Sequence, residues 1–397
     1  MIRLYELIEK LCPDGVEYKS LKELCSIKEK EAITKDDLGE GGEYPVINSS
    51  RDVLGYYSEY NNEPDTLVLT SHGAYAGFCH YMNERFFAGA LCYPMQTTDD
   101  SIISTKFLYY LFKNNEALIR ERFVNKSGVP YINFKGLMAH KVPVPPKPVQ
   151  DEIVSILDTF TSLTAELQAE LQARKIQYDE YVNILIEKGD FKENKKKPLN
   201  EIFDFRNGLS KGKEFFGKGI PFIRYTDVYN NRVLRASDLS ALVECTDAEI
   251  EKLRVNKGDV LFTRTSETAE DVGWSSVLLD DVDQCVFNGF CIKASPKTDD
   301  LLPEYCAYCF STRSFRQYVA SHCAFTTRAS LTGKTIGEYE MTIPSHEEQK
   351  AIVEVLDKLY LLCTDLSCGI PAEIEARQVQ YEYYRNELLA FKELKVV

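Results

Sequence analysis

Hydrophobic positions recur with coiled-coil spacing over one long segment of the chain. Between Val149 and Lys188 there is no glycine or proline, and the seam positions alternate at steps of four and three, with Thr164 and Arg174 completing the series. This spacing is typical of a helix that buries a narrow seam against a partner helix. The pattern predicts one continuous helix over 150–186. Its apolar seam consists of Ile153, Leu157, Phe160, Leu167, Leu171, Tyr178, Tyr181 and Leu185.

The same helix is written a second time near the end of the chain. The sequence QDEIVSILDTF at 150–160 returns as QKAIVEVLDKL at 349–359, and ARKIQYDEYVNIL at 173–185 returns as ARQVQYEYYRNEL at 376–388. The second copy carries an insertion with Gly369 and Pro371, residues that favour a helix end and a helix start. We therefore expect the second helix to be broken near Gly369 and to pair antiparallel with the first. Its seam consists of Ile352, Leu356, Leu359, Leu366, Tyr381, Tyr384 and Leu388.

The segments that precede the two helices also resemble each other. EYPVINSS at 43–50 matches GIPFIRYT at 219–226, and DTLVLTSHGAYAG at 65–77 matches GDVLFTRTSETAEDVG at 258–273. Each of the latter pair reads as a buried strand that runs into a polar loop with glycine. The expected fold is α+β, with two pseudo-symmetric α/β domains joined by two long antiparallel coiled-coil helices. The expected boundaries are 1–148, 149–188, 189–343 and 344–397.

Charge and composition narrow the choice of partners and location. The formal net charge is −14, of which 150–187 and 344–397 carry −6 and −4. The two long segments are thus near neutral and can present local basic faces to phosphate. No apolar run is long enough to span a membrane, and the first residues do not resemble a signal peptide. The 12 cysteines do not show the regular spacing of a disulfide-stabilised scaffold. We expect a reduced, cytoplasmic protein without membrane contact.

Four phrases carry a resemblance to a known family. LIEKLCPDGVEYKSLKEL, PVPPKPVQDEIVSILD, IPSHEEQKAIVEVLD and GIPAEIEARQVQYEYYRNELL resemble the specificity subunit of type I restriction–modification systems, in order along the whole chain. Two departures concern the first copy. It has Val149 before its glutamine where the second has Glu348, and it lacks the GIP element. Both departures concern how that helix would bind a partner subunit.

The resemblance implies a recognition subunit without a catalytic site. Each α/β domain would be a target recognition domain that reads one half of a bipartite double-stranded DNA target. The helices would set the spacer and dock two methyltransferase (modification) subunits, and two motor/nuclease (restriction) subunits can join them. No cofactor is expected in this chain, because the partner subunits would bind S-adenosylmethionine, ATP and Mg.

Catalytic and metal motifs are weak in the sequence itself. There is no Asn/Asp-Pro-Pro-aromatic motif and no phosphate-binding loop, since GLSKGKEF at 208–215 has the wrong spacing. PDGVEYK at 13–19 resembles a nuclease site, but its two acids are too close in sequence. Cys306 and Cys309 form one CxxC in an apolar run, where core packing is favoured over zinc. We expect no catalytic residue and no metal.

DNA reading requires Lys or Arg for phosphates and polar side chains for base edges. The densest loop of this kind is RNGLSKGKEFFGKG at 206–219, for which a merely solvated loop is the alternative. In the first domain the candidates are Asn48, Arg51, Ser71, His72, Tyr75, Lys126, Ser127, Asn133 and Lys135. In the second they are Arg206, Asn207, Ser210, Lys211, Lys213, Lys218, Arg224, Thr226, Arg264, Thr265, Arg328 and Lys334.

Two other functions compete with this interpretation. One is a specificity subunit of another restriction type, which serves a fused methyltransferase–nuclease and is distinguished only by its partner chains. The other is a coiled-coil scaffold with no DNA role, which predicts the absence of salt-sensitive DNA binding.

Overall fold

The computed structural model describes residues 2–39, 41–189, 191 and 196–394. The chain divides into two compact units: unit 1 is Met1–Gln168 with Glu373–Val397, and unit 2 is Ala169–Ala372. Each unit is an α/β module together with part of the long helices. The unit boundaries fall inside the helical segments, whereas the predicted domain boundaries set these segments apart from the modules. In the described part of the chain, no helix is long and apolar enough to cross a membrane.

The long helices have the predicted continuity. Helix α6 runs without interruption over Lys147–Glu187, whereas the second copy forms α13 (His346–Thr364) and α14 (Ile370–Leu388). A Cβ atom at Gly369 would lie 2.7 Å from the carbonyl oxygen of Asp365, so glycine permits the close backbone approach at the interruption. The prediction of one continuous and one broken helix is confirmed.

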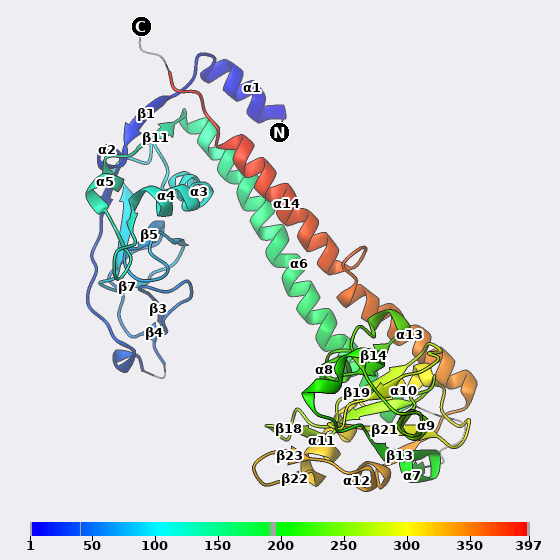
Figure 1. Cartoon of the computed structure of the whole chain (residues 1–397). Helices are drawn as coiled ribbons and strands as arrows, with labels where there is room; N and C mark the ends of the chain where they lie inside the picture. The colour runs from blue at the N-terminus through cyan, green and yellow to red at the C-terminus, as the bar shows by residue number, and fades with distance from the viewer. Residues whose placement is uncertain (1, 40, 190, 192–195, 395–397) are drawn as a thin grey trace. The chain divides into compact units, whose positions relative to one another are not determined.

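Each unit contains an antiparallel helix pair (Figure 1). In unit 1 the ring of Phe160 on α6 stacks on Tyr384 of α14, with 5.5 Å between centroids. In unit 2 the ring of Tyr178 lies 5.8 Å from Tyr360 of α13. Farther along α6, Val182 and Ile186 share a core with residues nearer the start of α13. Residue numbers therefore increase along α6 while those of the contacting residues on α14 and α13 decrease. The predicted antiparallel pairing is confirmed.

The buried face of the helices departs from the predicted seam toward the end of α6. Ile153 and Leu157 are buried, but Tyr181 is exposed, and Val182 and Ile186 are buried in its place. A straight α-helix drifts by about 20° per heptad relative to a 3.5-residue repeat, which moves the buried face by one position over several heptads. Leu366 lies in the interruption between α13 and α14 and is 75% exposed. The remaining seam residues are buried or half-buried: Phe160, Leu167, Leu171, Tyr178, Leu185, Ile352, Leu356, Leu359, Tyr381, Tyr384 and Leu388.

The module of unit 1 is built on a four-stranded sheet in the order β2-β8-β5-β6. Its helices α3 and α4 pack against each other, and α3 covers strands β5 and β6. The elements are α1 (Ile2–Leu11), β1 (Glu17–Ser20), α2 (Leu21–Leu24), β2 (Cys25–Ile27), β3 (Tyr44–Ile47), β4 (Tyr56–Tyr57), β5 (Thr66–Thr70), β6 (Cys79–Met82), β7 (Phe87–Ala88), β8 (Cys92–Thr97), α3 (Thr105–Asn114), α4 (Glu116–Phe123), β9 (Val124–Asn125), β10 (Tyr131–Ile132), α5 (Phe134–Met138) and β11 (Lys141–Val144).

The module of unit 2 repeats this order on a five-stranded sheet, β13-β21-β17-β19-β15. Helix α10 packs on β19, as α3 packs on β6. The elements are β12 (Lys196–Pro198), α7 (Leu199–Ile202), β13 (Phe203–Asn207), β14 (Phe216–Ile223), α8 (Tyr225–Asn230), β15 (Val233–Leu234), β16 (Leu242–Val243), α9 (Asp247–Leu253), β17 (Val260–Thr263), β18 (Thr265–Ser266), β19 (Ser275–Leu278), β20 (Val286–Phe287), β21 (Cys291–Pro296), α10 (Pro303–Cys309), α11 (Arg313–His322), β22 (Ala324–Phe325), β23 (Ala329–Ser330), α12 (Gly333–Gly337) and β24 (Glu340–Thr342). The predicted fold class is confirmed.

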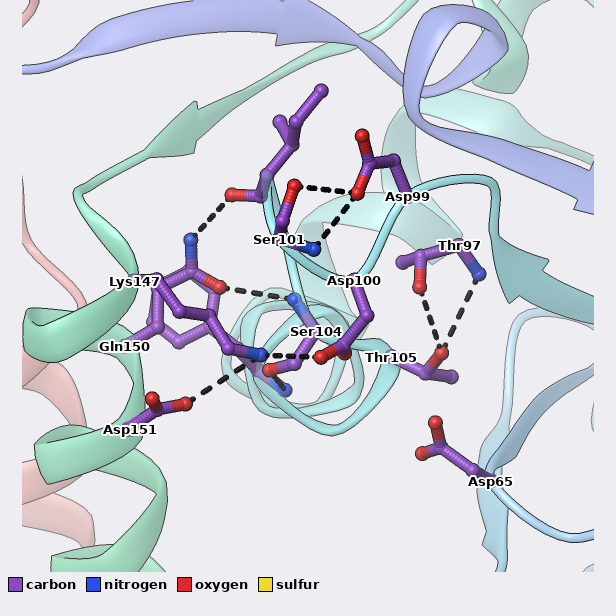
Figure 2. A network of polar contacts seen from close by, with 12 residues as sticks. Asp65, Thr97, Asp99, Asp100, Ser101, Ser104, Thr105, Lys147, Gln150 and Asp151 are labelled. Carbon is purple, nitrogen blue, oxygen red and sulfur yellow. Dashed lines mark hydrogen bonds and ion pairs between the residues drawn. The ribbon is translucent and has the colours of Figure 1, made fainter.

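A buried glutamine attaches each module to the start of its long helix. Figure 2 shows the network in unit 1, where Gln150 donates to the carbonyl oxygens of Ile102 and Pro145, both at 2.7 Å, and accepts from the backbone N–H of Ser104 at 3.0 Å. In unit 2, Gln349 donates to the carbonyl oxygens of Asp300 and Pro344 at 2.7 and 2.9 Å. Its side-chain oxygen accepts from the backbone N–H of Leu302 at 2.8 Å. The repeated motif thus encodes an attachment point as well as a helix.

A tyrosine–aspartate pair makes a second attachment in each unit. Tyr110 of α3 donates to Asp158 of α6 at 2.5 Å, and Tyr308 of α10 donates to Asp357 of α13. Burial, followed by the bond to the carboxylate, raises the pKa of both phenols well above the ordinary value. Both tyrosines therefore remain neutral donors at physiological pH.

Candidate nucleic-acid interface

In unit 1, the polar loop after β5 is tied to the β9–β10 hairpin. The backbone N–H of Ile132 donates to the carbonyl oxygen of Ser71 at 2.9 Å, and that of Gly73 donates to Pro130 at 2.8 Å. His72 and Tyr131 form a bridge, and their rings are stacked with centroids 6.3 Å apart. The loop at 71–77 and the hairpin at 124–132 therefore form one surface, on which Tyr75 is also exposed.

Unit 2 has the same arrangement after β17. The backbone N–H of Leu331 donates to the carbonyl oxygen of Arg264 at 2.9 Å, and Thr265 pairs with Ser330 of the β22–β23 hairpin. The backbone N–H of Arg264 donates to Phe290 at 2.7 Å, which brings the 287–290 segment to the same place. Figure 1 shows β18, β22 and β23 together at one end of this unit. The loops at 71–77 and 264–273 contain residues that the sequence predicts to read DNA, and on that prediction we call them the reading loops.

An arginine from the neighbouring helix clamps each reading loop. Arg120 of α4 donates to the carbonyl oxygen of Ala74 at 2.9 Å. Arg316 of α11 donates to the carbonyl oxygens of Glu270 and Val272 at 2.5 and 2.8 Å, and its guanidinium lies 4.3 Å from the ring of Trp274. Burial lowers the pKa of Arg316. No sequence pattern indicated this role, because a hydrogen bond to a backbone carbonyl does not depend on which residue supplies the carbonyl.

The hairpin tips carry three of the predicted candidates. Lys126 and Ser127 lie at the exposed tip of the β9–β10 hairpin, and Arg328 lies at the tip of the β22–β23 hairpin. Asn133 caps α5 by accepting from the backbone N–H of Gly136 at 3.1 Å, which gives it a structural role. The exposed Lys135 is on the same helix, and Lys334 on α12 lies 3.9 Å from Glu338.

The loop 206–219 divides into two parts with different roles. Asn207 and Ser210 are exposed. They lie near the reading loop because the backbone N–H of Gly289 donates to the carbonyl oxygen of Leu209 at 2.7 Å, and Gly289 belongs to the 287–290 segment that is bonded to Arg264. Lys211 instead donates to Glu249 and to the carbonyl oxygen of Glu244, both at 2.7 Å, and its side chain is only 13% exposed. This geometry disfavours Lys211 as a phosphate contact.

Three further candidates of this loop lie on the surface. Arg206 donates to the carbonyl oxygen of Lys252 at 2.7 Å and Lys218 pairs with Glu244 at 3.0 Å, both while exposed. Lys213 is also exposed.

The matching segments at 48–51 and 224–226 hold one buried candidate and three exposed ones. Asn48 is buried, and its side-chain oxygen accepts from the backbone N–H of Leu91 at 2.9 Å. Arg224 pairs with Asp227 at 2.7 Å at the start of α8. Arg51, Arg224 and Thr226 are exposed, and the Arg51 guanidinium lies 5.2 Å from the ring of Tyr75, next to the reading loop.

A second kind of surface lies on α6 and on α14. Most of its residues are of the same type at matching positions of the two helices. On α6, Arg174 donates to Gln177 at 2.9 Å and lies 3.4 Å from Glu170 beside Ile176, which is 62% exposed. On α14, Arg377 donates to Gln380 at 3.2 Å and lies 3.4 Å from Glu373 beside Val379, which is 63% exposed. We call these two surfaces the helix faces. Their lining residues are Glu170, Ala173, Arg174, Ile176, Gln177, Glu180, Tyr181 and Ile184 on α6, and Glu373, Ala376, Arg377, Val379, Gln380, Tyr383 and Tyr384 on α14.

The titratable residues offer little for metal binding. Among the described residues, no three His, Cys, Asp or Glu side chains gather in a way that could hold a metal ion. Cys306 and Cys309 are buried in the core of unit 2, and burial raises the pKa of both thiols, which disfavours the thiolates that zinc requires.

Sequence and structure comparisons agree with this architecture. The family model described as "Type I restriction modification DNA specificity domain" matches the chain twice, over residues 13–174 and 192–376. The chain is 29% identical to the type I restriction enzyme EcoR124I/EcoR124II specificity subunit of Escherichia coli, with 98% of each covered. It is 28% identical to a putative type I specificity subunit of Mycoplasma pneumoniae, with 84% of this chain and 96% of that protein covered.

Solved structures share the fold at low sequence identity. The S subunit of a type I restriction–modification system from M. genitalium matches with a TM-score of 0.53 and 18% identity, over 94% of this chain and 96% of that chain. A chain from a structure concerned with complex assembly and conformational transition of the type I R-M system matches with a TM-score of 0.64 and 13% identity, over 96% of this chain and 98% of that one. With two copies of the family domain along its length, this chain belongs to the type I restriction–modification DNA specificity family.

Proposed function

We propose that the chain is the DNA-recognition subunit of a type I restriction–modification complex and that each module reads one half of a bipartite double-stranded target. The observation that supports this proposal is the repeated surface of a reading loop and a hairpin. The backbone arrangement is the same in both units, but the side chains differ. His72 and Tyr131 occupy the positions that Thr265 and Ser330 occupy in the other unit. Equivalent backbones with different side chains suit two readers of different sequences.

The helices take the remaining roles in this proposal. They set the length of the unread spacer and dock two methyltransferase subunits, and two restriction subunits complete the complex. The transferred methyl group, ATP hydrolysis and cleavage belong to those partners, which hold S-adenosylmethionine, ATP and Mg. The chain itself contributes recognition and no catalytic residue. The complex acts on DNA in the cytoplasm.

The helix faces support docking of two identical partners. A partner that recognises Ala173, Arg174 and Gln177 on α6 meets the same residue types at Ala376, Arg377 and Gln380 on α14. Exposed Ile176 and Val379 give each face an apolar centre with a polar rim, which is the usual composition of a protein interface. The acidic balance of 150–187 and 344–397 disfavours DNA as the occupant of these faces.

Native mass spectrometry of the chain coexpressed with its methyltransferase subunit tests this proposal. We expect the unaltered chain to carry two methyltransferase subunits. Ile176→Glu or Val379→Glu alone should leave one bound subunit, because each places a charge at the centre of one face. The two changes together should leave the chain without methyltransferase.

The matched control is Leu361→Glu, which places the same charge on an exposed apolar residue of α13 outside both faces. This variant should keep two subunits. Loss of both subunits from either single variant would contradict independent docking, and retention of both by the double variant would show that the faces are not the docking surfaces.

A further inference from the structure

One position of the repeated helix motif changes from apolar to cationic between the two copies. The second copy has Arg385 where the first has Val182, in sequence that otherwise largely matches. Val182 is 3% exposed and belongs to the core of unit 2. Arg385 is half-buried on α14, where its Nε donates to the side-chain oxygen of Asn114 at 3.0 Å and its guanidinium lies 5.3 Å from the ring of Tyr381. The second copy of the motif thus supplies a positioned cation to unit 1.

Arg385 lines a cleft of about 690 Å³ in unit 1. The other walls come from the reading loop at 71–77, from the ends of α3 and α4, and from the β9–β10 hairpin, which contributes Lys126. A group bound in this cleft would therefore contact the long helix and the predicted DNA-reading surface at the same time.

The cleft gathers positive charge that the chain itself does not neutralise. Glu116 pairs with Lys113 at 2.9 Å. In the described part of the chain, Arg120 and Arg385 bond to neutral oxygens, and the exposed Lys126 forms no hydrogen bond or ion pair. Three cations thus converge with one further acid, Glu121. Cations gathered at one place repel each other unless a counter-charge binds, so the cleft favours an anionic ligand.

The corresponding cleft of unit 2 has its charges balanced within the chain. It lies beside Arg316, the counterpart of Arg120. Its other two arginines, Arg232 and Arg313, lie 3.5 Å from Asp357 and 3.1 Å from Glu180. The long helix contributes a valine there in place of the arginine. An anion is therefore favoured in unit 1 only.

We propose that the unit 1 cleft binds a phosphate of the DNA backbone beside the half-site that this unit reads. Arg385 is its principal ligand, because the bond to Asn114 occupies Nε and leaves both Nη atoms for phosphate oxygens. Lys126 holds the same or the adjoining phosphate. Phosphate contacts fix the position of a protein on the duplex without reading its sequence. This inference rests on the proposed DNA-recognition function and adds to it a phosphate contact made by the long helix.

The test uses the full chain in complex with its methyltransferase subunit and duplexes that contain its methylation target. Each backbone phosphate is replaced in turn by a neutral methylphosphonate. We expect a replacement beside one half-site to weaken binding by about fivefold at about 0.15 M salt, the contribution of one phosphate contact. Arg385→Gln should abolish the effect of that replacement and leave the others in place. It should also reduce the slope of log K against log salt concentration by about one unit.

A second variant and a control keep the test independent of folding. Lys126→Gln alters an exposed side chain without a partner in the described residues, and it should abolish the effect of the same or the adjoining replacement. The matched control is Lys392→Gln, which removes the charge of an exposed lysine just after α14 and outside the cleft. This variant should leave the salt slope and every replacement effect unchanged.

The outcomes separate this inference from the proposed function. If Arg385→Gln weakens binding but leaves every replacement effect in place, or if Lys392→Gln lowers the salt slope equally, the cleft does not bind a DNA phosphate. Thermal stabilisation by inorganic phosphate that Arg385→Gln abolishes, without loss of any replacement effect, would show that the ligand is a free anion instead. Salt-sensitive target binding by the unaltered complex would still uphold DNA recognition in these cases. Absence of any such binding would overturn the proposed function itself.

Discussion

At the scale of single residues, two buried glutamines hold the modules to the helices. Gln349 makes three hydrogen bonds to backbone groups. A substitution that cannot form these bonds leaves the buried backbone groups without a partner. Gln349→Glu keeps the size of the side chain but replaces the amide donor by a carboxylate that faces two carbonyl oxygens. We expect the free energy of unfolding of unit 2 to fall by about 3 kcal/mol, because each unsatisfied buried group costs about 1–3 kcal/mol. Denaturant titration followed through Trp274 emission measures this loss.

The control for this variant is Gln317→Glu on α11 of the same unit, where the side chain is exposed. That change should alter stability by less than about 0.5 kcal/mol. An equal and small effect of both substitutions would contradict the attachment role of Gln349. The sequence showed Gln150 and Gln349 only as members of a repeated helix motif, since their backbone partners lie outside that helix.

The same reason explains why sequence composition does not show which DNA-contact candidates already have a partner within the chain. Asn48, Lys211 and Arg224 have the right side chains in loops of the right composition. The structure gives each of them an intramolecular partner, namely Leu91 N–H, Glu249 and Asp227. Composition identifies polar loops but does not reveal which carboxylate or amide lies across space from a given cation.

At the scale of elements, the reading loops depend on arginines that lie outside them. Arg316 bonds two carbonyl oxygens of the loop at 264–273. We expect Arg316→Gln to raise the hydrogen-exchange rate of amides in this loop by about tenfold, because losing the clamp removes about 1.4 kcal/mol of local stability. Hydrogen exchange followed by mass spectrometry resolves the loop from the rest of unit 2.

Arg313→Gln is the matched control on the same helix, since its guanidinium pairs with Glu180 on the surface. Exchange in the loop should be unchanged in this variant. Two results would show that Arg316 does not hold the loop. One is equally fast exchange of the loop in both variants, and the other is exchange in the Arg316→Gln variant that is as slow as in the unaltered chain.

Elements with a regular period were the most predictable part of the fold. The 4-3 spacing predicted α6, and Gly369 with Pro371 predicted the interruption between α13 and α14, because both signals are local in sequence. The end of the seam was less predictable. Tyr181 was expected inside, but the drift of a straight helix against the 3.5-residue repeat turns Val182 and Ile186 toward the core of the unit 2 module instead. A periodic pattern identifies a buried face only while a single partner covers the helix.

At the scale of the whole molecule, the central claim is that one chain carries two independent readers of DNA. Each unit has its own core, its own reading loop and hairpin, and its own glutamine attachment. Damage to the reading surface of unit 2 should therefore leave recognition by unit 1 intact. Arg264→Ala with Arg328→Ala removes two cations from the unit 2 surface. If either contacts a guanine, its loss costs about 1–3 kcal/mol of discrimination at that base pair.

Methylome sequencing of cells that make the unaltered chain, the Arg264→Ala Arg328→Ala chain or no such chain tests this claim most directly. We predict adenine methylation at a bipartite motif, its disappearance without the chain, and relaxed sequence preference in one half of the motif for the double variant. Methylation that persists without the chain, or a double variant that relaxes both halves equally, would contradict the account.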